Sequence, residues 1–217
     1  MQQNILFLIF IFIFAGCSQP PAVNKWQYDA VSSLQAYQEH FLKNRLLRAK
    51  SDLSRARSFA SQSADLHTRI DIELTVCAMQ LSVLNPTSCE NASVLLQIDP
   101  EPSQLAYLSL LRSDLKEEEI KQLPEQYQAF GTAMIEANPA KINTRLEQIK
   151  PLSSRLIASA LVQSHLSNKN LESLIAELSY HGYKNPLIAW LTVHMQKETD
   201  PEKKVRLKAK ISVLTSS

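Results

Sequence analysis

The sequence predicts an all-α fold, an array of antiparallel helical hairpins arranged as a solenoid or as an irregular bundle. Apolar residues recur at helical spacing from residue 25 to the end of the chain, and no segment alternates with the period of a β-strand. The 217 residues include only three glycines, Gly16, Gly131 and Gly182, and turn-rich β folds depend on glycine for positive φ angles. Prolines precede helical patterns instead, where their missing N–H group costs little.

The expected helices follow one another through short connections, so that consecutive helices should run antiparallel. A residue that can cap a helix often stands just before the proline, as in Asn185-Pro186 and Asp200-Pro201. The apolar spacing and the prolines predict helices over residues 25–43, 45–62, 65–84, 90–97, 102–112, 114–122, 124–137, 139–149, 151–166, 169–181, 185–197 and 201–214.

The helix over residues 65–84 has two apolar sides. One row comprises Leu66, Ile70, Leu74, Cys77, Leu81 and Leu84, and a second comprises Ile72, Val76, Met79 and Val83. At 100° per residue the two rows lie on well-separated sides of the helix, and a helix that is apolar on two sides is covered on two sides. We therefore expect an inner helix of a layered array.

One hairpin resembles a tetratricopeptide repeat. Ala49-x3-Leu53-x2-Ala56 matches the small-large-small pattern of the second helix of that family, in which small residues let two helices approach closely. The preceding helix departs from the repeat, because Tyr37 stands where the family has Gly and His40 where it has Tyr. The pattern does not recur at the family's period of about 34 residues. The resemblance implies an array of α-hairpins.

The first residues have the pattern of an export signal. Residues 5–14 are all apolar, a run too short to span about 30 Å of hydrocarbon as a helix but long enough for the apolar region of a signal peptide. The run leads into Phe14-Ala15-Gly16-Cys17, which resembles the lipobox of bacterial lipoproteins. Phe14 departs from the Leu, Val or Ile usual there, and residues 1–4 contain no Lys or Arg. The alternatives are a secretory leader cut elsewhere and an uncleaved anchor.

The lipoprotein resemblance implies cleavage before Cys17 and acylation of Cys17, with more than one acyl chain, as stable anchoring requires. Ser18 follows, and in enterobacterial members a residue other than Asp at this place permits transport to the outer membrane. The expected organisation is a signal peptide over 1–16, a tether over 17–24 and a helical domain over 25–217, with a sub-boundary near 85–101 left open. The implied location is the bacterial envelope, at the outer membrane and facing the periplasm.

Two further cysteines, Cys77 and Cys89, flank the expected turn at residues 85–88. Export would place them in an oxidising compartment, where a pair is more often bridged than free. A disulfide would join the end of one helix to the start of the next. The alternative is two buried thiols, since Cys is a good small core residue.

Charge is segregated along the chain. Residues 24–85 carry a net charge of +2, residues 86–139 of −6 and residues 140–217 of +6. Such a distribution suits oriented contact with a partner or an anionic surface, and the alternative is an incidental distribution of solubilising charge. The last helix surrounds the apolar row Leu207-Ile211-Leu214 with cations, which predicts either membrane contact or a capping helix with a solvated face. These cations are Lys203, Lys204, Arg206, Lys208 and Lys210.

A second basic run covers the expected helix over 45–62, whose apolar positions include Leu46 and Leu47. We interpret it as a solvated helix face, because nucleic acid is not an expected partner of an exported protein. No glycine-rich phosphate loop or GxSxG motif is present, and the five histidines have no partners at metal-ligand spacing. The sequence therefore predicts no catalytic, cofactor or metal site.

These observations favour a non-catalytic interaction module that is held at a membrane and contacts another envelope protein. Stacked helical hairpins suit this role because they create extended surfaces. The first alternative is a helical carrier of a lipid or another hydrophobic ligand in the periplasm. The second is a cell-wall-active enzyme whose reactive groups are scattered along the chain.

Overall fold

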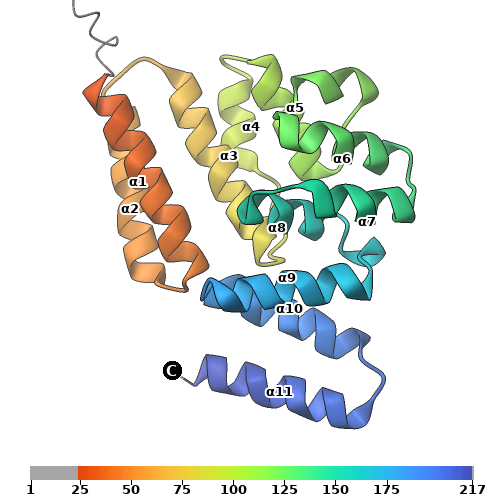
Figure 1. The fold of residues 1–217 in the computed structure, drawn as a ribbon. Helices are drawn as coiled ribbons and strands as arrows, with labels where there is room; N and C mark the ends of the chain where they lie inside the picture. The colour runs from red at the N-terminus through yellow and green to blue at the C-terminus, as the bar shows by residue number, and fades with distance from the viewer. Residues whose placement is uncertain (1–23, 217) are drawn as a thin grey trace, which may run out of the picture.

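The computed structural model describes residues 24–216, which form eleven α-helices and two short 3-10 helices and contain no strand (Figure 1). The elements are α1 (Lys25–Leu42), α2 (Leu46–Ala60), α3 (Leu66–Ser82), α4 (Glu90–Leu96), α5 (Pro102–Arg112), η1 (Glu117–Gln122), α6 (Glu125–Ile135), α7 (Pro139–Gln148), α8 (Leu152–Leu161), η2 (Gln163–His165), α9 (Asn168–Tyr180), α10 (Lys184–Lys197) and α11 (Pro201–Thr215). The all-α prediction is confirmed, and sequential helices pack as hairpins.

Two expected helices differ from the structure. The segment expected as a helix over 114–122 is the 3-10 helix η1, because the chain leaves α5 through Ser113 at a φ of 59°. The Glu119 carboxylate then accepts a hydrogen bond from the Lys116 N–H at 2.8 Å and closes a tight local turn. The helix expected over 151–166 ends at Leu161, since Val162 has non-helical dihedral angles and a 3-10 turn follows it.

The helix α3 lies inside the array, as its two apolar rows predict. It packs against α1 and α2 on one side and against α4, α5 and α8 on the others. Its buried side chains include Ile70 and Leu74 from the first row and Ile72 and Met79 from the second. Figure 1 shows α3 between the α1–α2 hairpin and the remaining helices.

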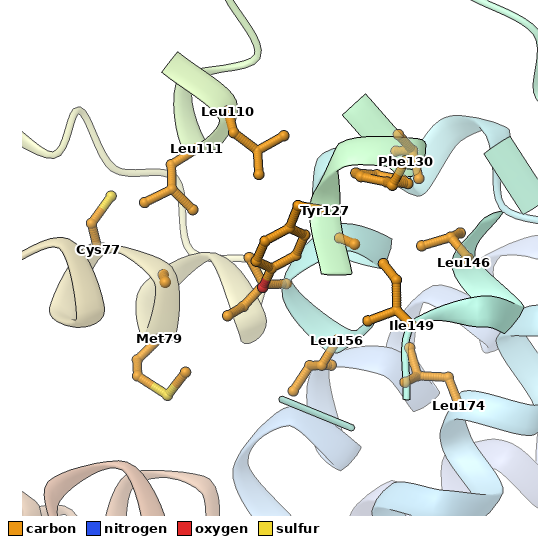
Figure 2. Packing of buried hydrophobic residues seen from close by; sticks show 14 of the residues in the cluster. Cys77, Met79, Leu110, Leu111, Tyr127, Phe130, Leu146, Ile149, Leu156 and Leu174 are labelled. Carbon is orange, nitrogen blue, oxygen red and sulfur yellow. The ribbon is translucent and has the colours of Figure 1, made fainter. Parts of the chain in front are cut away.

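The main core runs through the molecule from α1 to α11. In its centre the Tyr127 ring of α6 lies between Leu110 and Leu111 of α5 on one side and Ile149 and Leu156 on the other (Figure 2). A smaller cluster of Ala30, Ala56, Ala60 and Ile72 joins the α1–α2 hairpin to α3. Within the described residues, every buried residue of both clusters lies between positions 30 and 207.

The α1–α2 hairpin forms an outer layer of the molecule (Figure 1). Its two helices pack most extensively on each other, and smaller contacts with α3 and α10 hold the pair to the body. Ala49 and Ala56 are buried and Leu53 is partly buried, so the small-large-small pattern does mediate close helix packing here. The rest of this hairpin's surface is open to solvent.

The last three helices form the other end of the array. The Trp190 ring of α10 is fully buried, and its indole N–H donates a hydrogen bond to the Ser82 carbonyl at 3.1 Å, which ties α10 to the end of α3. The final helix α11 packs on α10. Within residues 24–216, no helix combines the length and the hydropathy needed to cross a bilayer.

Candidate functional site

An open groove of about 720 Å³ lies between α9 and α11 and has α10 as its floor. Both α9 and α11 pack extensively on α10, whereas no comparable packing joins α9 to α11. The groove is lined by Glu172, Ile175, Ala176, Ser179, Leu187, Leu191, His194, Leu207, Ala209, Lys210, Val213 and Leu214. The end of the array therefore leaves a groove whose floor leucines, Leu187 and Leu191, are buried, and whose walls expose Ala176, Ala209 and Val213.

The connection between α10 and α11 sets the direction of the final helix. The Glu198 carboxylate accepts hydrogen bonds from the N–H groups of Thr199 and Asp200 at 2.9 and 3.0 Å. The Asp200 carboxylate in turn caps α11 by accepting from the N–H groups of Glu202 and Lys203. These backbone hydrogen bonds lower the pKa of both carboxyl groups, because they stabilise the ionised form.

The groove walls combine branched apolar side chains with small ones. Ile175 on α9 faces Val213 and Leu214 on α11, whereas Ala176, Ser179 and Ala209 are small. Small residues on both walls leave room for a backbone to approach closely. The dimensions and this lining suit one additional helix laid along the groove.

Charged side chains border the groove unevenly. Lys210 is part of the lining, and by helical spacing Lys203 and Arg206 lie on the same side of α11. Lys204 and Lys208 lie on the other side, and all five cations are exposed. On the opposite border the His194 Nε2 atom lies 3.9 Å from a Glu172 carboxylate oxygen. The α11 border is therefore basic.

The predicted disulfide is present between Cys77 on α3 and Cys89, the residue before α4, with their Cα atoms 5.2 Å apart. The loop between them is also held to α5, because the Arg112 guanidinium donates two hydrogen bonds to the Ser88 carbonyl at 3.1 and 2.7 Å. The bridge thus fastens α4 to the inner helix, as the spacing of the cysteines predicts.

A buried ionic cluster that the sequence pattern did not reveal joins α2 to α3. The Glu73 carboxylate on α3 is buried and accepts two hydrogen bonds from the Arg57 guanidinium on α2, at 2.9 and 2.6 Å. It also accepts one from Arg69 at 3.0 Å. The nearby phenol of Tyr37 has a pKa of about 12, which burial raises and the Arg57 charge partly offsets. The hydrogen bonds of Glu73 with Arg57 and Arg69 thus join α2 to α3 and have a structural role.

A second buried carboxylate, Asp52, lies between α1 and α2. It contacts the His40 Nδ1 atom at 2.5 Å and forms an ion pair with Arg55. Burial by itself raises the pKa of Asp52, but the hydrogen bonds from His40 and Arg55 outweigh it and hold the pKa below its usual value. The contact between His40 and Asp52 joins α1 to α2.

The other polar and aromatic side chains of the described residues do not gather into a second site. His181 stacks on Tyr183 and meets the Tyr180 ring edge-on, and Gly182 adopts a φ of 64° in the turn that follows α9. Trp190 is buried away from this turn. Among the described residues, no group of three His, Cys, Asp or Glu side chains is placed to hold a metal ion.

The predicted lipidation site, Cys17, and the lipobox around it lie outside the described residues, which begin at Asn24. The comparisons with known proteins found no family model that matches this chain, no similar curated protein and no similar solved structure.

Proposed function

We propose that the chain is a non-catalytic interaction module of a bacterial envelope, which binds a helix of a partner protein in the α9–α11 groove. The observation that carries this proposal is the open groove between two helices that both pack on α10, with Ala176, Ala209 and Val213 exposed on its walls. The basic α11 border favours a partner helix with acidic residues along one side.

The proposed location rests on the N-terminal pattern. The lipobox resemblance at Phe14-Ala15-Gly16-Cys17 supports an acylated mature N-terminus at the outer membrane, facing the periplasm. Metabolic labelling with a fatty-acid probe tests this directly: the wild-type chain should be labelled and the Cys17→Ala variant should not. Label retained in Cys17→Ala would overturn the proposed anchor.

Site-specific photo-crosslinking tests the groove. A photoreactive amino acid at Ser179 or Val213, in the full-length protein in its own envelope, should give one recurrent adduct with a second protein. The exposed Gln97, which directly follows α4 and does not line the groove, serves as the control position. Repeated recovery of the uncrosslinked protein alone from both groove positions contradicts the proposal.

The same groove supports one alternative, a carrier of a hydrophobic ligand. Its volume falls within the range of small-molecule sites, roughly 300–1,000 Å³. An open groove exposes one side of a lipid to water, however, so a helix that brings its own polar face fits better. Extraction of the purified protein followed by mass spectrometry separates the two: a stoichiometric lipid would favour the carrier.

A further inference from the structure

The α1–α2 hairpin exposes large apolar side chains together with cations. Four of the exposed large apolar residues of the described chain lie on this hairpin: Tyr28 and Val31 on α1, and Leu46 and Leu47 at its tip. Leu47 is 87% exposed and Leu46 is 52% exposed, so neither contributes to the core. The position of these two leucines at the connection between the helices makes them the most prominent apolar group of this layer.

Cations surround the two leucines. Arg45, Arg48 and Lys50 are exposed, and none of them forms an ion pair with another described residue. The acidic groups nearest the tip are already paired, because Glu39 pairs with Lys43 and the buried Asp52 pairs with Arg55, while Asp29 lies near the start of α1, at the other end of the hairpin. The tip therefore presents apolar side chains within an unbalanced positive charge.

From this arrangement we propose that the hairpin tip binds an anionic phospholipid surface, with Leu46 and Leu47 entering the boundary between headgroups and acyl chains. Cations bind the lipid phosphates while apolar side chains reach below them, the combination by which peripheral segments hold to membranes. The tip lies at the end of the α1–α2 hairpin (Figure 1), where Asn44, Arg45, Leu46, Leu47 and Arg48 line a wide, open depression. A fluid bilayer covers an open surface of this kind without a matching shape, whereas a protein partner would need one.

The position in the chain supports the same occupant. The hairpin is the first folded element, and seven residues separate Cys17 from Asn24, a reach of about 25 Å when extended. The axis of α1 is about 27 Å long, so a chain anchored at Cys17 brings the whole hairpin within reach of the same bilayer. Only this argument from the chain position depends on the proposed acylation of Cys17.

Vesicle sedimentation of residues 18–217, which lack the acylated cysteine, tests the hairpin without the anchor. The protein should bind vesicles that contain phosphatidylglycerol and bind phosphatidylcholine vesicles weakly. The triple variant Arg45→Gln/Arg48→Gln/Lys50→Gln should lower partitioning by about 100-fold, at about fivefold per cation. The matched control is Lys203→Gln/Lys208→Gln/Lys210→Gln on α11, which should bind as the wild type does.

The apolar contribution has its own pair of variants. Leu46→Ser/Leu47→Ser should weaken binding by at least about tenfold, whereas Val94→Ser/Ile98→Ser, at comparably exposed positions on and just after α4, should not. A Leu47→Trp variant should show a blue-shifted emission on adding phosphatidylglycerol vesicles, and a Val94→Trp variant should not. These positions are exposed, so unchanged thermal melting is the expected check on folding.

Three results overturn the proposal: wild-type protein that does not bind phosphatidylglycerol vesicles, α11 or α4 controls that lose as much binding as the hairpin variants, or an unshifted Leu47→Trp spectrum. Loss in the α11 variant alone would place the membrane contact on the last helix instead. Crosslinking from Ser179 and Val213 reports on the groove separately.

Discussion

Reduction of the Cys77–Cys89 disulfide should lower the free energy of unfolding by about 3 kcal/mol. The bridge closes a loop between residues 12 apart in sequence. The chain-entropy relation for a loop of this size gives about 3 kcal/mol near 25 °C, because the bridge removes conformations from the unfolded chain. For a domain of roughly 200 residues this corresponds to a fall in Tm of about 6–12 °C.

Urea denaturation of residues 18–217 measures this effect. The oxidised protein, the reduced protein and the Cys77→Ala/Cys89→Ala variant should be compared under the same conditions. Reduced protein and double variant both lack the bond, so the difference between them reports the packing lost when two buried sulfur atoms are removed. Hydrogen exchange should show the largest increase in α4, which the bridge fastens to α3.

The disulfide should be detectable both in the denaturation midpoint and in the number of reactive thiols. Native protein under non-reducing conditions should contain no titratable thiol at Cys77 or Cys89. Equal denaturation midpoints for the oxidised and reduced proteins would refute the entropic argument, and two reactive thiols in the native protein would refute the bridge itself.

Three further changes test the supports of the fold. Glu73→Gln should cost about 2 kcal/mol in urea denaturation, because it weakens the charge-assisted hydrogen bonds between the buried carboxylate and the partly exposed Arg57; Glu177→Gln, at a more exposed carboxylate, should cost less than about 1 kcal/mol. Since the pKa of Asp52 is lowered in the folded protein, its stabilising effect is present above its unfolded pKa of about 3.9 and is lost as the pH falls through the folded pKa. Asp52→Asn should therefore flatten the acid fall of the unfolding free energy, and an unchanged pH profile would contradict this. Gly182→Ala should cost about 1 kcal/mol in the same measurement, because a side chain is strained at a φ of 64°, and no loss would show that the turn relaxes.

Much of the fold follows from local patterns. The proline positions and the apolar spacing locate nearly all helices because both act within one or two turns of the chain. The inner position of α3 follows from its two apolar rows, since a surface helix needs only one. The disulfide was predictable from the turn between the two cysteines, which brings neighbouring helix ends together.

The ionic cluster around Glu73 required the tertiary structure. Arg57 lies 16 residues before Glu73, and their contact depends on how α2 crosses α3. One sequence signal did exist: Glu73 stands between Ile72 and Leu74 on a helix that is covered on two sides, where a charge needs a partner. The identity of that partner was not readable from spacing.

The sequence pattern did not reveal the groove or the hairpin tip either, because exposure of an apolar side chain depends on how the helices are arranged. Ile175 and Leu214 lie on the apolar sides of their helices, and they remain partly exposed because α9 and α11 both pack on α10 without packing on each other. Leu46 and Leu47 likewise have the character of buried helix positions. They are exposed at the first two positions of α2, next to the turn where α1 and α2 meet.

Salt alone cannot distinguish the two proposed contacts, because both the groove border and the hairpin tip are basic and both would weaken as ionic strength rises. Apolar substitutions do distinguish them. Leu47→Ser should weaken vesicle binding and leave crosslinking from Ser179 intact, whereas Val213→Glu should abolish the Ser179 adduct and leave vesicle binding intact. If each substitution weakened both activities, the hairpin and the groove would have to act as one continuous surface, and the assignment of lipid to one and a protein helix to the other would fail.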